Sequence, residues 1–176
     1  MTIDTFEREF VKPRPGRTLI VGSRVYKDKR DRRALYEPGN VLGVDMLEGP
    51  GVNTVIDMER PDPAERIGTF DHVECLSVLE HSERPWRLAA NLETVMVPGA
   101  TLFVSVPFCW PIHSYPDDYW RVSPAALEIL FPSIEWVARR LINQTVLEHG
   151  AKIARHKVNG YPYFPRTETC GFGVKR

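Results

Sequence analysis

Gly22, Asp45 and Asp57 stand at the ends of three short apolar runs, RTLIVG, NVLGVDM and TVID. Such runs are typical of buried parallel strands, and in an open parallel sheet the ligand binds beyond the carboxyl ends of the strands. Asp45 follows Gly22 by 23 residues, close to the spacing at which a carboxylate accepts hydrogen bonds from ribose hydroxyls. The pair therefore favours ligand binding over an ordinary turn. Asp57 has two interpretations: it could accept from an exocyclic amine such as that of adenine, or cap the next helical turn.

A fourth apolar run, FDHVECLSVLEH, ends with polar residues that we expect at the same edge of the sheet. Ser77 lies among apolar neighbours, and Glu80 and His81 follow it. Hydrogen-bonding groups therefore gather beyond this strand. For a lone histidine here, a structural role such as a hydrogen bond to a nearby carbonyl is a better explanation than catalysis.

The stretch CWPIHSYPDDYWRVSP, which follows a fifth apolar run, is more aromatic and more charged than a passive loop requires. Part of it has a structural explanation, because Asp118 and Arg121 could form an internal ion pair and Trp120 could anchor the following helix to the core. The remaining candidates for contact with a substrate are His113, Tyr115 and Asp117.

The elements that must position these residues alternate between strands and helices. One helix is predicted from Pro85 to the stop at Pro98 and Gly99, and another after Ser123, which could cap it. This alternation indicates an α/β domain with a mostly parallel sheet. The predicted strands cover 17–22, 40–46, 54–57, 70–79, 101–108, 134–142 and, as a last edge strand, 170–176.

The length and composition predict one domain. A chain of 176 residues, 43% of them hydrophobic, can bury one substantial core, so we expect a single domain over 1–176. Within it, residues 1–16 form a charged N-terminal arm. Residues 143–169 are too long and irregular for an ordinary connection, which predicts a lid or an insertion.

Charge and cysteine content exclude several classes of partner. The 23 basic and 23 acidic residues cancel, which disfavours nucleic acid. No apolar run approaches the roughly 20 residues that span a bilayer, and the N-terminus has no apolar secretory segment, so we expect no membrane association. The cysteines at 75, 109 and 170 lie far apart, which argues against disulfides and a zinc knuckle and favours the cytoplasm. No metal site is predicted.

Several of these stretches together resemble a known family. The succession VGS, GVDMLEGPGVNTVIDM, FDHVECLSVLEH, VPGATLFVSVPF and HSYPDDYWRVSPAALEILF resembles class I S-adenosylmethionine-dependent methyltransferases, in particular those allied to the type 11 group. The resemblance covers Arg17 to Phe131. It implies a Rossmann-like fold with an antiparallel last strand and helices on both faces. It also implies transfer of a methyl group from S-adenosylmethionine to an acceptor that the sequence does not identify.

The resemblance also implies roles for individual residues. Gly22 and Ser23 match the loop that passes the methionine portion of the cofactor, and Asp45 matches the acidic residue that holds the ribose. The residues expected near adenine are Met46, Asp57 and Met58, and those expected near the reactive end of the cofactor are Leu76, Ser77 and His81. In the segment after the fifth strand we expect His113 or Asp117 as a general base, and Tyr115 and Tyr119 as contacts to the acceptor.

The first loop departs from the family pattern. An acidic residue and two further glycines are expected there, but Ile20, Arg24 and Tyr26 occupy those places. S-adenosylmethionine has no phosphate, so a side chain could replace the close backbone approach that glycines permit. We expect Arg24 to reach the methionine carboxylate through a charge-assisted hydrogen bond. In the alternative, Arg24 faces solvent and the cofactor binds weakly or not at all.

Two other functions remain as alternatives. The glycine-poor loop would fit a catalytically silent relative that acts as a binding or regulatory partner. A nicotinamide-dependent dehydrogenase is disfavoured, because the first strand is not followed by G-x-G-x-x-G.

Overall fold

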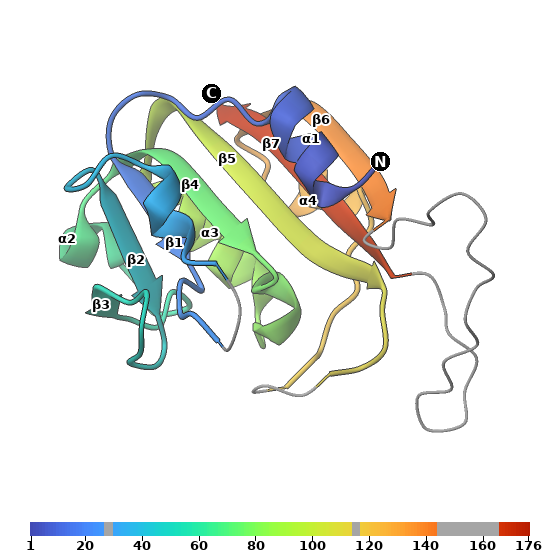
Figure 1. The fold of residues 1–176 in the computed structure, drawn as a ribbon, viewed down its shortest axis with the longest axis horizontal. Helices are drawn as coiled ribbons and strands as arrows, with labels where there is room; N and C mark the ends of the chain where they lie inside the picture. The colour runs from blue at the N-terminus through green and yellow to red at the C-terminus, as the bar shows by residue number, and fades with distance from the viewer. Residues whose placement is uncertain (27–29, 114–116, 144–165) are drawn as a thin grey trace.

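A computed structural model describes residues 1–26, 30–113, 117–143 and 166–176, and it is organised around one seven-stranded sheet (Figure 1). The strand order is β3-β2-β1-β4-β5-β7-β6. Neighbours from β3 to β5 are parallel, whereas β7 runs antiparallel to both β5 and β6. The strands are β1 (Thr18–Val21), β2 (Val41–Asp45), β3 (Thr54–Val55), β4 (Phe70–Leu76), β5 (Met96–Cys109), β6 (Ile134–Asn143) and β7 (Thr167–Lys175). This architecture confirms the predicted Rossmann-like α/β class.

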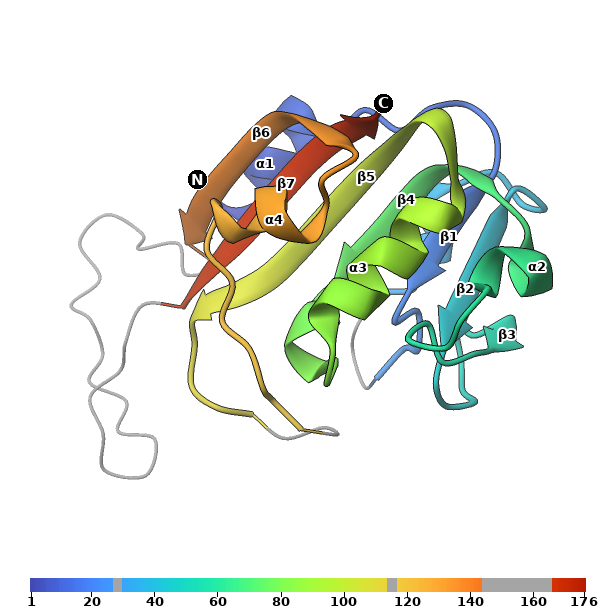
Figure 2. The same ribbon diagram turned by 180° about the vertical axis from the view of Figure 1, so that it is seen from behind.

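Helices cover both faces of the sheet. One face carries α1 (Ile3–Phe10) and the short 3-10 helix η1 (Arg32–Leu35), and the other carries α2 (Pro63–Ile67), α3 (Pro85–Thr94) and α4 (Ala126–Leu130), as the two opposite views show (Figures 1 and 2). The central strands are buried between these layers, which explains their continuous apolar runs. A second 3-10 helix, η2 (Leu79–His81), follows β4.

The N-terminal segment is a helix of the domain and not merely a charged arm. Thr2 caps α1, because its Oγ1 accepts a hydrogen bond of 3.2 Å from the backbone N–H of Thr5. Phe6 is fully buried, and its ring stacks on Phe103 of β5 with centroids 6.0 Å apart. The prediction of a charged arm is thus wrong for residues 3–10, which form a helix whose apolar side packs in a second core cluster.

The last strand is not an edge strand. β7 lies between β5 and β6, and it begins at Thr167, three residues before the predicted start at Cys170. Of the predicted lid or insertion, Asn143 belongs to β6 and the residues from Thr167 onward belong to β7. Residues 144–165 lie outside the described residues, so the lid itself stays a prediction. The helix that was expected to continue to Pro98 ends at Thr94, because β5 begins at Met96.

Within the described ranges, no helix combines the length and the apolar character needed to cross a bilayer.

Candidate functional site

The register of the strands brings the polar strand ends together at one edge. Val21 of β1 pairs with Val44 of β2 and with Cys75 of β4, so the residues that follow these three positions share the carboxyl edge of the sheet. They include Gly22 and Asp45, as the sequence predicted. Ligands of open α/β sheets bind at this edge, close to the point where the strand order reverses.

Gly22 occupies a position that suits only glycine. Its φ of +71° is in the left-handed region, and a Cβ atom there would lie 2.5 Å from Cγ2 of Val78. The N–H of Gly22 donates a 2.9 Å hydrogen bond to the carbonyl of Val44. The loop after β1 is therefore pressed against the segment after β4, where the methyl-donating end of a cofactor is expected.

Asp45 is held rigidly by the backbone. Its Oδ2 accepts from the N–H of Arg24 at 3.3 Å, and its Oδ1 accepts from the N–H of Leu47 at 3.0 Å. Each carboxylate oxygen can accept a further hydrogen bond, so the side chain remains able to bind a pair of hydroxyls. Beside it, Met46 is 62% exposed, which leaves an apolar surface on which a planar ring can pack. Their expected contacts with the ribose and with adenine stay predictions.

The loop after β1 contains a buried hydroxyl. Oγ of Ser23 is inaccessible to solvent, and it has no hydrogen-bond partner among the described residues. A Cβ atom on Gly43 would lie 2.7 Å from this oxygen, so the hydroxyl is directed toward β2. The expected contact of Ser23 with the methionine portion stays a prediction.

The Arg24 side chain lies beside Tyr26 and the turn after β2. Its guanidinium carbon lies 5.1 Å from the centroid of the Tyr26 ring. A Cβ atom on Gly49 would lie 2.7 Å from its Nε, which places the side chain against the turn after β2. The expected contact with the methionine carboxylate stays a prediction.

Asp57 and Met58 both have structural roles. Oδ1 of Asp57 accepts a 2.9 Å hydrogen bond from the N–H of Glu59, and its Oδ2 lies 3.4 Å from Nε of Arg60. Asp57 thus closes a turn, which is typical of this residue type. Met58 is only 4% exposed and belongs to the main core cluster. Their expected contacts with adenine stay predictions.

Ser77 adopts an uncommon backbone conformation directly after β4. Its φ is +54°, and its N–H donates a 2.9 Å hydrogen bond to the carbonyl of Ser105. For a residue other than glycine, this region costs roughly 1–2 kcal/mol, and such strain concentrates at functional sites. Leu76, the last residue of β4, is partly buried against the second core cluster.

Three ionisable side chains meet beyond the ends of β4 and β5. Glu80 and His81 belong to η2, and His113 lies in the segment after β5. A carboxylate oxygen of Glu80 and a ring nitrogen of each histidine all lie within 4.8 Å of one another. Burial raises the pKa of Glu80 to about 8, and the nearby carboxylates of Glu168 and Asp118 act in the same direction.

The sequence placed Glu80 at this edge, but it did not predict that the residue is buried or that it meets His113. The signal in the sequence is that Glu80 directly follows the apolar stretch SVL. A charged side chain at such a position is ordinarily expected to face solvent. The contact itself joins segments more than 30 residues apart, which no local pattern encodes.

The segment after β5 is braced by an ion pair, as the sequence predicted. Arg121 binds Asp118 through Nη1 and Nη2, at 2.5 and 2.7 Å. The hydrogen bonds from Arg121 lower the pKa of Asp118 to about 2, and the backbone N–H of His113 contributes to the shift. Trp120 is also an anchor, although for a different helix: its Nε1 donates to the carbonyl of Ser82 at 2.8 Å, just before α3.

The other predicted residues of this segment lie close to the three-residue cluster. The carbonyl oxygen of Asp117 lies 2.5 Å from Nδ1 of His81, and the N–H of Tyr119 donates to the carbonyl of Glu80 at 2.7 Å. The Tyr119 side chain is 48% exposed. Tyr115 lies outside the described residues.

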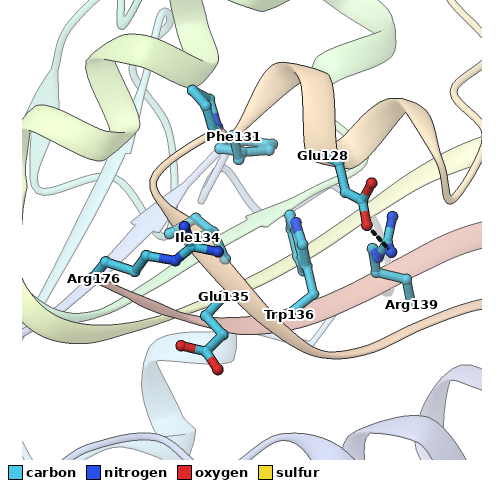
Figure 3. A pocket seen from close by; sticks show the side chains of 8 residues that line it. Glu128, Phe131, Ile134, Glu135, Trp136, Arg139 and Arg176 are labelled. Atoms are coloured by element: carbon cyan, nitrogen blue, oxygen red, sulfur yellow. Dashed lines mark ion pairs between the residues drawn. The ribbon is translucent and has the colours of Figure 1, made fainter.

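A hollow of about 330 Å³ lies elsewhere, between α4 and β6 (Figure 3). Ile134 begins β6, and β6 runs parallel to β5 because β7 is antiparallel to both. The hollow therefore lies toward the amino ends of the parallel strands, at the opposite edge from Asp45. Its lining residues are Glu128, Phe131, Pro132, Ile134, Glu135, Trp136, Arg139 and Arg176.

Comparison with known proteins finds solved structures with a similar fold. No family model matches the chain, and no curated protein sequence matches it. One similar solved structure is a complex of the Haloferax volcanii Trm112 methyltransferase activator with a candidate methyltransferase, with 15% identity over 99% of this chain and 88% of the other and a TM-score of 0.68. Another is 1,6-didemethyltoxoflavin-N1-methyltransferase of Burkholderia thailandensis with its substrate and S-adenosylhomocysteine, with 16% identity over 92% and 72% and a TM-score of 0.64.

A third similar structure is an S-adenosylmethionine-dependent methyltransferase of Anabaena variabilis, with 12% identity over 99% of this chain and 82% of the other and a TM-score of 0.64. At such identities the likeness concerns the fold. Together with the strand order and the single antiparallel strand between β5 and β6, it shows that the chain has the fold of class I S-adenosylmethionine-dependent methyltransferases.

Proposed function

We propose that the protein is an S-adenosylmethionine-dependent methyltransferase. The observation that carries this proposal is Asp45, whose two carboxylate oxygens are fixed by the N–H groups of Arg24 and Leu47. An oriented carboxylate at the end of β2 has the chemistry to hold a ribose diol. The similar Burkholderia thailandensis enzyme was solved with S-adenosylhomocysteine, which supports the same cofactor here.

Three further residues would complete the cofactor site. Ser23, whose N–H donates a 3.1 Å hydrogen bond to the carbonyl of Val44 at the end of β2, would lie alongside the methionine portion. The exposed side chain of Met46 would pack on the adenine ring, as apolar side chains do at nucleoside sites. Ser77, held with a positive φ, would line the end of the site where the methyl group lies. When bound, S-adenosylmethionine would supply a methyl group on an already activated sulfonium.

The task of the chain would then be to position an acceptor in line with the sulfur. A base is required only if the acceptor must lose a proton. His113 is the candidate for this role, since its side chain is 39% exposed at the carboxyl edge; Asp117 is a second candidate. Tyr119 would contact the acceptor through its exposed ring, and we expect the same of Tyr115.

A catalytically silent protein that uses this fold to bind a partner is the second candidate function. The observation that favours it is the position of Arg24. This residue stands in the loop where the family pattern has glycines, and its side chain packs on Tyr26 and beside Gly49.

In either case we propose a cytoplasmic location, because all three cysteines are free thiols and a reducing compartment keeps them so.

Calorimetric titration with S-adenosylmethionine and with S-adenosylhomocysteine tests the proposed function. The Asp45→Asn variant keeps the shape of the side chain but removes its charge and one acceptor, and we expect it to bind at least ~10-fold more weakly, the loss of about 1.4 kcal/mol. Glu135→Gln, an exposed change at the opposite edge, is the control and should bind like the wild type. A folded wild-type protein that binds neither compound would favour the silent alternative.

A further inference from the structure

Glu80 carries a carboxylate that is buried beside two histidines. Its side chain is fully buried, and neither carboxylate oxygen has a hydrogen-bond partner from another described residue. Its nearest ionic neighbour is His81, whose Nε2 lies 3.7 Å from Oε1, beyond hydrogen-bonding distance. A carboxylate buried in this way is stabilised either by a proton or by a cation, and the two histidines beside it are the further ligands that a cation would need.

The two histidines lie at the positions that a cation ligand would need. A ring nitrogen of each and an oxygen of Glu80 lie within 4.8 Å of one another, and the two rings are nearly perpendicular, with centroids 5.0 Å apart. Two ligands at about 2.1 Å from a tetrahedral zinc ion lie about 3.4 Å apart. The Glu80–His81 separation of 3.7 Å is close to this value, and the partly exposed His113 has room to adjust.

His81 is oriented as metal-binding histidines are. Its Nδ1 lies 2.5 Å from the carbonyl oxygen of Asp117, so Nδ1 carries the proton and donates it. Nε2, the nitrogen that faces Glu80, therefore keeps its lone pair free. A backbone carbonyl bonded to the far nitrogen is the usual outer partner of a metal-binding histidine.

His113 is positioned from outside the cluster. Its backbone N–H donates a 2.9 Å hydrogen bond to Oδ2 of Asp118, and Arg121 holds that carboxylate in place. The hydrogen bond from Tyr119 to the carbonyl of Glu80 ties the segment that carries His113 to η2. The three side chains are thus held together by contacts that would remain in place if a cation bound between them.

We propose that Glu80, His81 and His113 bind one divalent transition-metal ion, with Zn²⁺ as the ion that best suits this ligand set. Two imidazoles and one carboxylate leave at least one coordination position open, as in catalytic zinc sites. The spacing of the cysteines gave no indication of this site, because none of its three ligands is a cysteine.

The next step rests on the proposed function. In a methyltransferase, a cation bound by these three residues would act on the methyl acceptor. The cluster follows Ser77, so an oxygen of the acceptor could occupy the open position near the methyl group. The cation would lower the pKa of a bound hydroxyl, so that its proton would pass to solvent before the oxygen attacks the methyl group. His113 would then act as a ligand and not as the base, because a ligand nitrogen cannot also accept a proton.

Titration of the chelator-treated, full-length protein with Co²⁺ tests the site, because Co²⁺ substitutes for Zn²⁺ and its visible absorption reports the ligand geometry. We expect one equivalent to bind with the absorption of a four- or five-coordinate ion, and Zn²⁺ to displace it. Glu80→Gln, His81→Gln and His113→Gln should each weaken binding at least ~100-fold, the upper end of the losses seen for outer-shell partners. Circular dichroism of each variant checks its folding.

Two controls separate this site from adventitious binding. Glu83→Gln removes an exposed carboxylate from the same connection and should leave the affinity unchanged. The double variant His149→Gln/His156→Gln removes the two histidines that lie outside the described residues, and it should also bind like the wild type. The proposal is overturned if the folded wild type binds no Co²⁺, or if binding survives the three ligand variants or disappears in the double variant.

The outcome is independent of the proposed methyltransferase function. If the protein binds Co²⁺ through the three ligands but does not bind S-adenosylhomocysteine, the cation site is supported and the proposed function is contradicted. If it binds S-adenosylhomocysteine but does not bind Co²⁺ through these ligands, only the cation site is contradicted.

Discussion

Arg32 and Glu74 form a bidentate ion pair on the face of the sheet that carries α1. Nε of Arg32 lies 2.6 Å from Oε2 of Glu74, and Nη2 lies 2.7 Å from Oε1. Glu74 is fully buried in the middle of β4, whereas the Arg32 side chain is 26% exposed. Nη2 also contacts Oε1 of Glu7 at 2.8 Å. One guanidinium therefore ties α1 and η1 to β4.

Substituting Arg32 should destabilise the protein strongly. Arg32→Ala leaves the Glu74 carboxylate buried without its cation, and breaking a buried pair in this way costs about 3–5 kcal/mol. Urea denaturation of the variant measures the loss. Arg87→Ala, at an exposed position of α3, is the control and should stay within about 0.5 kcal/mol of the wild type. A loss below about 1 kcal/mol for Arg32→Ala would show that the pair contributes no more than a surface contact.

The same pair should make the protein sensitive to acid. Burial alone would raise the pKa of Glu74, but the hydrogen bonds from Arg32, with His72 and Tyr36 nearby, outweigh it and lower this pKa to about 2. Because the folded pKa lies below the ordinary value of 4.5, the contribution to stability is present above pH 4.5 and is lost as the pH falls toward 2.

Urea denaturation at a series of pH values within this window tests the acid sensitivity. The free energy of unfolding of the wild type should fall across it, and that of Glu74→Gln should fall less, because its amide does not titrate. The control Glu37→Gln changes an exposed side chain and should follow the wild-type curve. Parallel curves for Glu74→Gln and the wild type would contradict the assignment.

The sheet was predictable from sequence because its central strands are buried on both faces, so these strands are mostly apolar, although β4 carries the buried His72 and Glu74. The same runs place Gly22 and Asp45 correctly, since residues after parallel strands must share an edge. α1 was missed because its charged residues dominate the composition of MTIDTFEREF. The pair Phe6 and Phe10, one helical turn apart, carries the helical signal.

Contacts between distant segments could not be predicted in this way. Arg32 and Glu74 lie 42 residues apart, and the interior charge in VECL only indicates that some partner must exist. The meeting of Glu80 with His113 is of the same kind. Local patterns determine which side of an element is buried, whereas the pairing of two buried charges depends on how the elements pack.

α1 should be a required part of the domain. Phe6→Ala removes a fully buried ring that stacks on Phe103, and deletion of a buried phenylalanine typically costs about 3–5 kcal/mol. Thermal unfolding measures the change. Phe10→Ala, at a half-buried position of the same helix, should cost distinctly less. If both variants matched the wild type, the helix would be dispensable, as expected of a loose arm.

Gly22→Ala should lower stability and cofactor affinity together, and Gly39 offers a matched control. Both glycines have a positive φ, +71° and +89°, but a Cβ atom on Gly22 would lie 2.5 Å from Cγ2 of Val78, whereas one on Gly39 would meet nothing within 4 Å. The left-handed penalty of roughly 1–2 kcal/mol applies to both variants. Only Gly22→Ala adds the clash, which typically costs a further 1–3 kcal/mol or so.

Urea denaturation and calorimetry with S-adenosylhomocysteine together separate these effects. Gly39→Ala should show the backbone penalty with unchanged affinity, and Gly22→Ala should show a larger loss of stability with affinity at least ~10-fold lower, about 1.4 kcal/mol. Adding Val78→Ala to Gly22→Ala should relieve the clash, so that the two changes are not additive. Equal losses for the two glycine variants would mean that the segment after β4 yields to the new methyl group. Unchanged affinity in Gly22→Ala would place the cofactor's methionine portion away from this loop.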